Sequence, residues 1–156
     1  MEVIAAQAYK RWQGKAYPAF TINSNDKVLT NANLKGKVLF INFWFAACPP
    51  CIAEFEALTE MYNNLKEKEG FEFISLTFES PEIIEKVRKK YNLSFPIYSI
   101  SNAECNRLSF GNGYPTNIVV DKSGIIDYIH AGGSTSKQEA KHFVDKEFYT
   151  RILQQL

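Results

Sequence analysis

The hydrophobic residues of this chain are concentrated in short runs that polar segments separate. The longest run is VLFINFWF, residues 38–45, in which Asn42 is the only polar residue. Such a run is typical of a strand buried on both faces, at the centre of a mostly parallel sheet. FEFISLTF from Phe71 and FPIYSI predict further strands, and NIVVDKSGIIDYI predicts a hairpin that turns at DKSG. FTINS and VLTN predict two short strands near the N-terminus, joined by a polar turn.

Other segments have the spacing of amphipathic helices. The stripe of the first helix consists of Cys51, Phe55, Leu58, Tyr62 and Leu65. SPEIIEKVRKKY predicts a second helix, with Ser80 as N-cap, Pro81 in the first position, and a face of Ile83, Val87 and Tyr91.

Two more helix starts carry a capping-box pattern. SNAE opens a small helix, with Ser101 and Glu104 as the box, and the last helix starts at Ser136, with Glu139 completing its box. The stripe of the last helix is Ala140, Val144, Phe148 and Ile152. The resulting order of strands and helices predicts an α/β sandwich, a mixed sheet with helices on both faces.

The 156 residues show no internal repeat, low-complexity tract or linker, so we expect one domain over residues 1–156. Residues 1–16 are predicted to be a peripheral segment. A hydrophobic content of 46% can fill one core. The net charge is +1 and no basic run is present, which argues against a nucleic-acid partner.

No uncharged apolar stretch reaches the roughly 18 residues of a membrane span, and MEVIAAQAYKRW lacks the pattern of a signal peptide. We therefore expect no membrane span in this chain. A leader removed by processing would leave the same sequence, so the localisation stays open at this point.

Three cysteines are too few for a disulfide scaffold, and only Cys48 and Cys51 are close in sequence, in the motif CPPC. If the first helix begins near Pro50, Cys48 lies at or just before its N-cap, where free amides and the helix dipole lower a thiol pKa. Cys48 is then the nucleophile. Cys51, one turn inside on the buried stripe, is the resolving thiol in a reversible exchange.

Three other roles are known for closely spaced cysteines such as those of CPPC. A structural zinc site needs four ligands, and His130 and His142 lie in unrelated elements. Covalent haem attachment needs CxxCH, but residue 52 is Ile. A purely structural disulfide across so short a loop would contribute little stability. None of these fits as well as redox exchange, and we expect no metal and no cofactor other than a Cys48–Cys51 disulfide.

With CPPC, the buried strand and a later YPT in place, the sequence resembles thioredoxin-fold proteins of the TlpA/ResA type. The resemblance extends from about Phe20 to the C-terminal helix, and GKVLFINFWFAACPPCIAE resembles the hallmark segment of that group. It implies a thioredoxin-like three-layer sandwich with a short N-terminal strand extension. It also implies that Cys48 attacks, that Cys51 resolves, and that Pro115 of YPT is a cis-proline that helps to hold the substrate backbone.

Glu54 matches the acid that this family carries three residues after the second cysteine. On a helix it lies roughly 60° from Cys51, whereas Glu56 and Glu60 point away. The resemblance implies that Glu54 relays a proton to and from Cys51. The alternative is an ordinary surface glutamate near the positive end of the helix. Asn42 stands where thioredoxins themselves have a buried Asp.

Two positions depart from the family. Ala47 replaces the usual Trp before the first cysteine, and Tyr114, before Pro115, is bulkier than the usual residue. Tyr114, Pro115 and Trp44 are the predicted substrate-binding residues, although Trp44 also fits a role as core filler. Cys105 shares a helix face with Leu108, which predicts a buried hydrophobe, with a third redox thiol as the alternative.

The leading hypothesis is a thiol–disulfide oxidoreductase that acts on protein disulfides, as a reductant. The resemblance implies a periplasmic or envelope location and a membrane-bound electron donor, and we expect a monomer. One alternative is a thiol peroxidase, but Phe45 stands where peroxiredoxins need Thr or Ser. The other is a non-catalytic binding module with the same fold.

Overall fold

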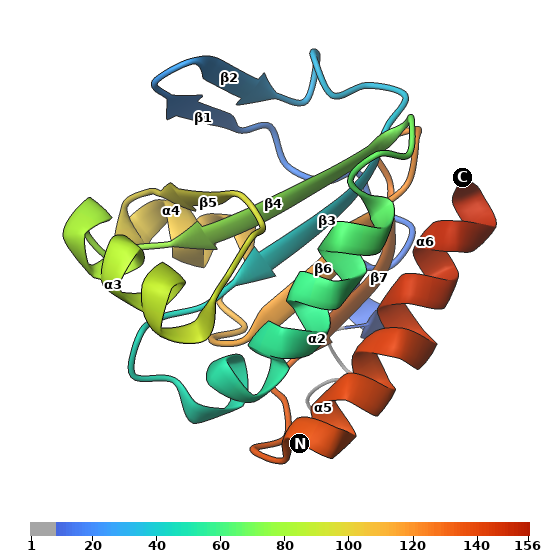
Figure 1. The fold of residues 1–156 in the computed structure, drawn as a ribbon. Coiled ribbons are helices and arrows are strands. Elements are labelled where there is room, and N and C mark those ends of the chain that lie inside the picture. The colour runs from blue at the N-terminus through green and yellow to red at the C-terminus, as the bar shows by residue number, and fades with distance from the viewer. Residues whose placement is uncertain (1–8) are drawn as a thin grey trace.

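The computed structural model describes residues 9–156, which form a five-stranded sheet in the order β5-β4-β3-β6-β7 (Figure 1). The strands of this sheet are β3 (Val38–Phe43), β4 (Phe71–Thr77), β5 (Ile97–Ser99), β6 (Thr116–Val120) and β7 (Ile126–Ala131). β3, β4 and β5 run parallel, whereas β6 and β7 run antiparallel to their neighbours. β1 (Thr21–Ser24) and β2 (Lys27–Thr30) form a separate antiparallel hairpin.

The central strand is β3, and all six of its residues are buried. This confirms the prediction from the apolar run, although the strand ends at Phe43, two residues before the run does. Parallel strands at the centre of a sheet are covered on both faces, which explains the nearly uninterrupted apolar sequence.

Helices and the hairpin cover the two faces of the sheet. The face that carries Phe40 and Val119 packs against α2 (Pro49–Leu65), α3 (Pro81–Tyr91) and the C-terminal helix. The opposite face packs against α4 (Asn102–Leu108) and the β1–β2 hairpin. In Figure 1, α2 and α5 lie side by side in front of the sheet. The predicted mixed sheet with helices on both faces is confirmed.

The segment before β1 forms backbone hydrogen bonds with the start of β7. The Gly14 amide donates to the Ile126 carbonyl at 2.9 Å, and the Ile126 amide donates to the Lys15 carbonyl at the same distance. Trp12 stacks on Phe110 of the opposite face at 4.0 Å between ring centroids. The predicted peripheral segment, residues 1–16, lies in part outside the described residues, and the part from Tyr9 onward packs against the domain.

The N-caps of the shorter helices follow the prediction. The Ser80 hydroxyl accepts from the Ile83 amide, and the Ser101 hydroxyl accepts from the Glu104 amide. The predicted face of α3 packs against the core, with Val87 buried and Ile83 and Tyr91 half-buried. Ile84, which the prediction left out, is buried as well.

The C-terminal helix is continuous but not uniform. It consists of α5 (Lys137–Phe143), a π-helical segment (Val144–Tyr149) and α6 (Thr150–Gln155). Its predicted stripe is buried as expected. The capping box is only half formed: the Ser136 hydroxyl accepts from the Glu139 amide, but the Glu139 carboxylate accepts from the Ser134 hydroxyl at 2.7 Å.

Candidate active site

Cys48 and Cys51 form a disulfide at the start of α2, with 5.3 Å between their Cα atoms. Cys48 is the N-cap and the helix begins at Pro49, which agrees with the predicted start near Pro50. The Cys51 amide donates to the Cys48 sulfur at 3.3 Å. Because neither proline has an N–H, this amide is the first one in the helix that can face the sulfur.

The segment before the disulfide is held by a charged side chain. The Ala46 amide donates to the Glu79 carboxylate at 2.7 Å, and the Glu79 carbonyl accepts from the Ser99 hydroxyl at the same distance. Glu79 thus connects the approach to Cys48 with the ends of β4 and β5.

Both cysteines are buried in the disulfide state, with exposed fractions of 2% for Cys48 and 0% for Cys51. The two cysteines differ in the exposure of their neighbours. Ala47 and Pro49, on either side of Cys48, are both exposed. Cys48 is therefore the sulfur closer to the surface, while Cys51 faces the core beneath α2. This arrangement fits the predicted nucleophile and resolving thiol.

A row of polar side chains crosses the sheet beneath α2. The Ser75 hydroxyl donates to the Asn42 side-chain oxygen, and the Asn42 side-chain amide donates to the Asn117 side-chain oxygen, both at 2.8 Å. These residues lie opposite one another on β4, β3 and β6. Each polar group thereby finds a partner in the core, where an unpaired one would cost free energy.

The row ends on Glu54. The Asn117 side-chain amide donates to Glu54 Oε1 at 2.9 Å, and the Asn42 side-chain amide donates to the same oxygen at 3.4 Å. Glu54 is 5% exposed, and burial raises its pKa to about 8, against which the hydrogen bond from Asn117 acts in part. At neutral pH Glu54 therefore keeps its proton while the disulfide is in place. The alternative that Glu54 is an ordinary surface glutamate is therefore excluded.

Two loops close over the start of α2. The Tyr114–Pro115 peptide bond is cis. Gly133, which follows β7, lies between these parts: a Cβ atom at this position would be 3.4 Å from Pro115 Cγ, 3.6 Å from Pro50 Cβ and 3.9 Å from Glu54 Oε2. Pro115, Pro50 and the carboxyl of Glu54 therefore meet at one point.

An aromatic cluster of Phe45, Phe78 and Tyr114 lies beside this point. Every pair of its rings is in contact, with centroids 6.0 Å apart for Phe45 and Phe78, 5.4 Å for Phe45 and Tyr114, and 5.7 Å for Phe78 and Tyr114. Phe78 is 37% exposed. A protein that approaches the disulfide from this side meets an apolar surface.

Trp44 and Cys105 lie inside the core. Trp44 is fully buried, and its ring packs edge-on against Phe55 at 5.5 Å, in the same cluster as both motif cysteines. This position matches the core-filler alternative more closely than substrate contact. Cys105 is a free thiol with no exposed surface, and burial raises its pKa to about 11. Cys105 is thus the buried hydrophobe that its helix position predicts.

Sequence reasoning missed the partners of Glu54. Ser75 in FEFISLTF and Asn117 at the start of NIVV are polar residues inside predicted buried strands, and this signal marks a buried polar network. His130, opposite Asn117 on β7, continues the same row. The connection between these residues depends on strand order, which a single sequence does not state.

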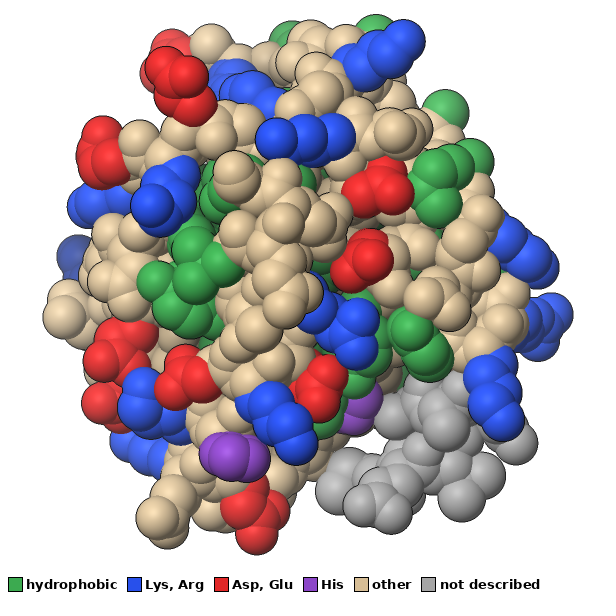
Figure 2. Space-filling view, turned by 90° about the vertical axis from the view of Figure 1, so that its right-hand side faces the viewer, with side chains coloured by type: hydrophobic (Ala, Val, Ile, Leu, Met, Phe, Trp, Pro, Cys, Tyr) green, Lys and Arg blue, Asp and Glu red, His purple; other side chains and the backbone are tan. Residues whose placement is uncertain are grey.

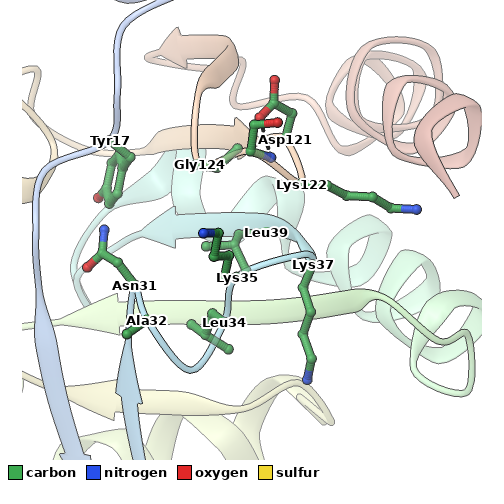
Figure 3. Close-up of a pocket in the computed structure, with 12 residues that line it drawn as sticks. Tyr17, Asn31, Ala32, Leu34, Lys35, Lys37, Leu39, Asp121, Lys122 and Gly124 are labelled. Carbon is green, nitrogen blue, oxygen red and sulfur yellow. Dashed lines mark hydrogen bonds between the residues drawn. The ribbon is translucent and has the colours of Figure 1, made fainter.

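One hollow lies away from the disulfide. It has a volume of about 420 Å³ and is found at the opposite end of β3, near Tyr17, Lys35 and Gly124 (Figure 3). Figure 3 shows the side chains of Lys37 and Lys122 extending outward from it. This hollow shares no residue with the redox site.

The rest of the described surface carries mixed charge. On the face that Figure 2 shows, basic and acidic side chains alternate without a patch of one sign. Within residues 9–156, no three metal-ligating side chains gather into one group. None of the helices in that range has the length and hydrophobicity that a membrane crossing requires.

The sequence is similar to those of known proteins. The sequence matches the Redoxin family over residues 13–144. The chain belongs to this family. It is 33% identical to the thiol-disulfide oxidoreductase ResA of Halalkalibacterium halodurans over 72% of this chain and 63% of that protein. It is 32% identical to the thioredoxin-like protein YneN of Bacillus subtilis, over 81% of this chain and 75% of that protein. The predicted resemblance to ResA-type proteins is confirmed.

Solved structures confirm the fold of this Redoxin member. A thiol:disulfide interchange protein of the thioredoxin family from Chlorobium tepidum superposes with a TM-score of 0.66 at 26% identity, over 85% of this chain and 95% of that one. StoA from Bacillus subtilis superposes with a TM-score of 0.63 at 20% identity, over 82% of this chain and 97% of that one. The thioredoxin-like three-layer sandwich is therefore established.

Proposed function

We propose that this protein is a thiol–disulfide oxidoreductase that reduces disulfide bonds of other proteins through Cys48 and Cys51. The observation that carries the proposal is the CPPC disulfide at the N-terminus of α2, with the buried acid Glu54 one turn further along the same helix. Relatives that carry the name thiol-disulfide oxidoreductase support the same chemistry.

The first step uses the position of Cys48. In the reduced protein, the Cys51 amide and the positive end of α2 stabilise a Cys48 thiolate. This thiolate attacks one sulfur of the substrate disulfide, which forms a mixed disulfide and releases the other substrate sulfur as a thiolate. The two prolines supply no further donors, so we expect a moderately lowered Cys48 pKa.

The second step uses Glu54. Burial raises the pKa of Glu54 to about 8, so a fraction of the carboxyl is ionised near neutral pH, and this carboxylate accepts the proton of the Cys51 thiol, directly or through one water molecule. The Cys51 thiolate then attacks Cys48, the Cys48–Cys51 disulfide forms, and the second substrate thiolate leaves. Two electrons have passed from the protein to the substrate. The disulfide itself is the electron carrier, and we propose no other cofactor and no metal.

The finer parts of the proposal rest on the resemblance to TlpA/ResA-type proteins. We propose that the protein works as a monomer in the periplasm or cell envelope and receives electrons from a membrane-bound donor. Its reduction potential, measured against glutathione buffers, should be more negative than that of glutathione. A more positive value would contradict the direction of electron flow.

The thiol peroxidase is disfavoured by Phe45. Peroxide reduction in that class needs a hydroxyl three residues before the cysteine, and here this position is an aromatic ring packed against Phe78 and Tyr114. The binding module is disfavoured because a buried acid next to a disulfide adds nothing to a passive surface.

Reduction of insulin with dithiothreitol as the electron donor tests the proposal. The wild type should accelerate insulin reduction, and Cys48→Ala should not. Cys105→Ala is the matched control, because Cys105 is buried away from the motif, and it should keep the wild-type rate. A wild type no faster than dithiothreitol alone would exclude the oxidoreductase and favour the binding module.

A further inference from the structure

The segment between β3 and α2 leaves the sheet just before the disulfide. The Trp44 amide still donates to the Leu76 carbonyl of β4 at 3.2 Å. From there the chain reaches Cys48 through Ala46, which is half-buried, and Ala47, which is exposed. An alanine offers a single methyl group for packing, so these two side chains do little to fix the path of the chain. The position of the segment must depend on other contacts.

One such contact comes from the carboxylate of Glu79. The Ala46 amide donates to Glu79 Oε2 at 2.7 Å, a length typical of a charge-assisted hydrogen bond. Glu79 is itself held by the ends of two strands. Its amide donates to the Thr77 hydroxyl of β4 at 3.3 Å, and its carbonyl accepts from the Ser99 hydroxyl of β5 at 2.7 Å. The carboxylate therefore links the sheet to a point two residues before Cys48.

Phe78, the neighbour of Glu79, contacts the same segment. Its ring stacks on Phe45, with 6.0 Å between the ring centroids and 21° between the ring planes. Two consecutive residues after β4 thus hold two consecutive residues after β3, one pair through rings and the other through a hydrogen bond. The exposed ring of the aromatic cluster and the chain that leads to Cys48 are fixed by a single piece of structure.

We propose that Glu79 is a positioning residue, which keeps Cys48 in register with the aromatic cluster so that the disulfide of a docked protein meets the attacking sulfur. The inference rests on the proposed function, in which a Cys48 thiolate attacks a protein disulfide. No bond to Glu79 forms or breaks in that step. A docked protein holds its disulfide in one orientation, so a displaced thiolate misses it, whereas a small disulfide can turn to meet the thiolate.

Two conservative variants separate the reach of Glu79 from its charge. Glu79→Gln keeps an acceptor oxygen at the same distance along the side chain but removes the charge. Glu79→Asp keeps the charge but is one methylene shorter, so its carboxylate no longer spans to the Ala46 amide in the same geometry. Glu82→Asp is the matched control, because it shortens an exposed acid in the first turn of α3 by the same methylene.

The measurement compares kcat/KM for the reduction of insulin with that for a small aromatic disulfide. Glu79→Asp should lower the value for insulin by about fivefold and change the value for the small disulfide little. Glu79→Gln and Glu82→Asp should keep both values. The iodoacetamide reaction of Cys48 should also stay unchanged in Glu79→Asp, because that reagent needs only an accessible thiolate.

Three results would overturn the positioning role. Full activity of Glu79→Asp with loss in Glu79→Gln would show that the charge matters and the reach does not. An equal loss of Glu79→Asp with insulin, the small disulfide and iodoacetamide would show general damage to the site. Wild-type values for every variant would leave Glu79 without a role. A wild type inactive on insulin would overturn the proposed function and this inference with it, so the two failures are distinguishable.

A double-mutant cycle tests whether Phe78 and Glu79 act as one unit. With insulin, the loss in Phe78→Ser combined with Glu79→Asp should be close to that of Phe78→Ser alone, because without the ring there is no docked register to keep. Losses that multiply would show that the two residues act independently and would contradict the shared register.

Discussion

Glu54 combines a charge-bearing group with a site that disfavours charge. Of residues 9–156, it is the one ionisable side chain of the Asp, Glu, Lys and Arg types that is buried. Two neutral amides face it and no cation does, so burial dominates and the neutral acid is the stable form. An acid that titrates near physiological pH can serve as both donor and acceptor for a thiol.

The pH dependence of stability tests this environment. Folded Glu54 holds its proton up to about pH 8, whereas an unfolded carboxyl releases it near 4.5. Unfolding therefore releases a proton between these values, and the free energy of unfolding that Glu54 contributes falls as the pH rises through this window. The oxidised wild type should lose stability relative to Glu54→Gln from about pH 5 to about pH 8 in denaturant unfolding. A constant difference would contradict the raised pKa.

The three cysteines should react in a fixed order. Cys48 lies at the helix N-cap next to exposed residues, Cys51 faces the core, and Cys105 is buried with a raised pKa. Iodoacetamide should therefore modify Cys48 first in the reduced native protein, as peptide mass spectrometry after short exposures would show. Faster modification of Cys51 or Cys105 would reverse the assignment of the nucleophile.

At the scale of elements, the C-terminal helix shows what the sequence pattern left out. Its stripe at 140, 144, 148 and 152 has a spacing of four residues, whereas an α-helix turns once in 3.6 residues. A straight α-helix would rotate this stripe by about 40° at every step. The π-helical segment Val144–Tyr149 has wider turns and keeps the stripe against the sheet. The four-residue spacing favours a helix with wider turns, but our prediction used only the presence of a stripe.

The start of the same helix can be tested by its cap. The Ser136 hydroxyl accepts from the Glu139 amide, and its loss would leave that donor unpaired. Ser136→Ala should lower the free energy of unfolding by about 1 kcal/mol. Thr135→Ala, at an exposed neighbouring position outside the cap, should change it little. Equal effects in chemical denaturation would show that the cap contributes nothing specific.

The helices and strands could be predicted from the hydrophobic periodicity of the sequence, but the candidate active site could be predicted only in part. Glu54 could be predicted because its relation to Cys51 lies within one helix. The row from Ser75 through Asn42 to Asn117 could not, because it joins residues on three strands whose order the local pattern does not state. For the same reason, the sequence did not predict that Gly133, in the loop after β7, lies next to Glu54.

At the scale of the whole molecule, the domain carries an apolar surface beside its disulfide. This surface is the aromatic cluster, with Phe45 after β3, Phe78 after β4 and Tyr114 before β6. The net charge of +1 supplies no strong field to steer a partner. Recognition of a substrate protein should therefore depend on apolar contact beside the disulfide.

Phe78→Ser tests this recognition. The substitution removes the most exposed ring of the cluster, so kcat/KM for a protein disulfide should fall by about tenfold. Reduction of a small disulfide should change little, because such a substrate makes few contacts beyond the sulfurs. Val28→Ser, at a 49% exposed position on β2, is the matched control. Loss with both substrates would indicate damage to the redox site instead of lost docking.

The central claim is exchange through a mixed disulfide at Cys48, and trapping that intermediate tests it most directly. In the variant Cys51→Ser the resolving thiol is absent, so attack on a protein disulfide should stop at the covalent complex. Incubation of the reduced variant with insulin, followed by mass spectrometry under non-reducing conditions, should give an adduct linked through Cys48. An adduct through Cys105, or none at all, would contradict the account.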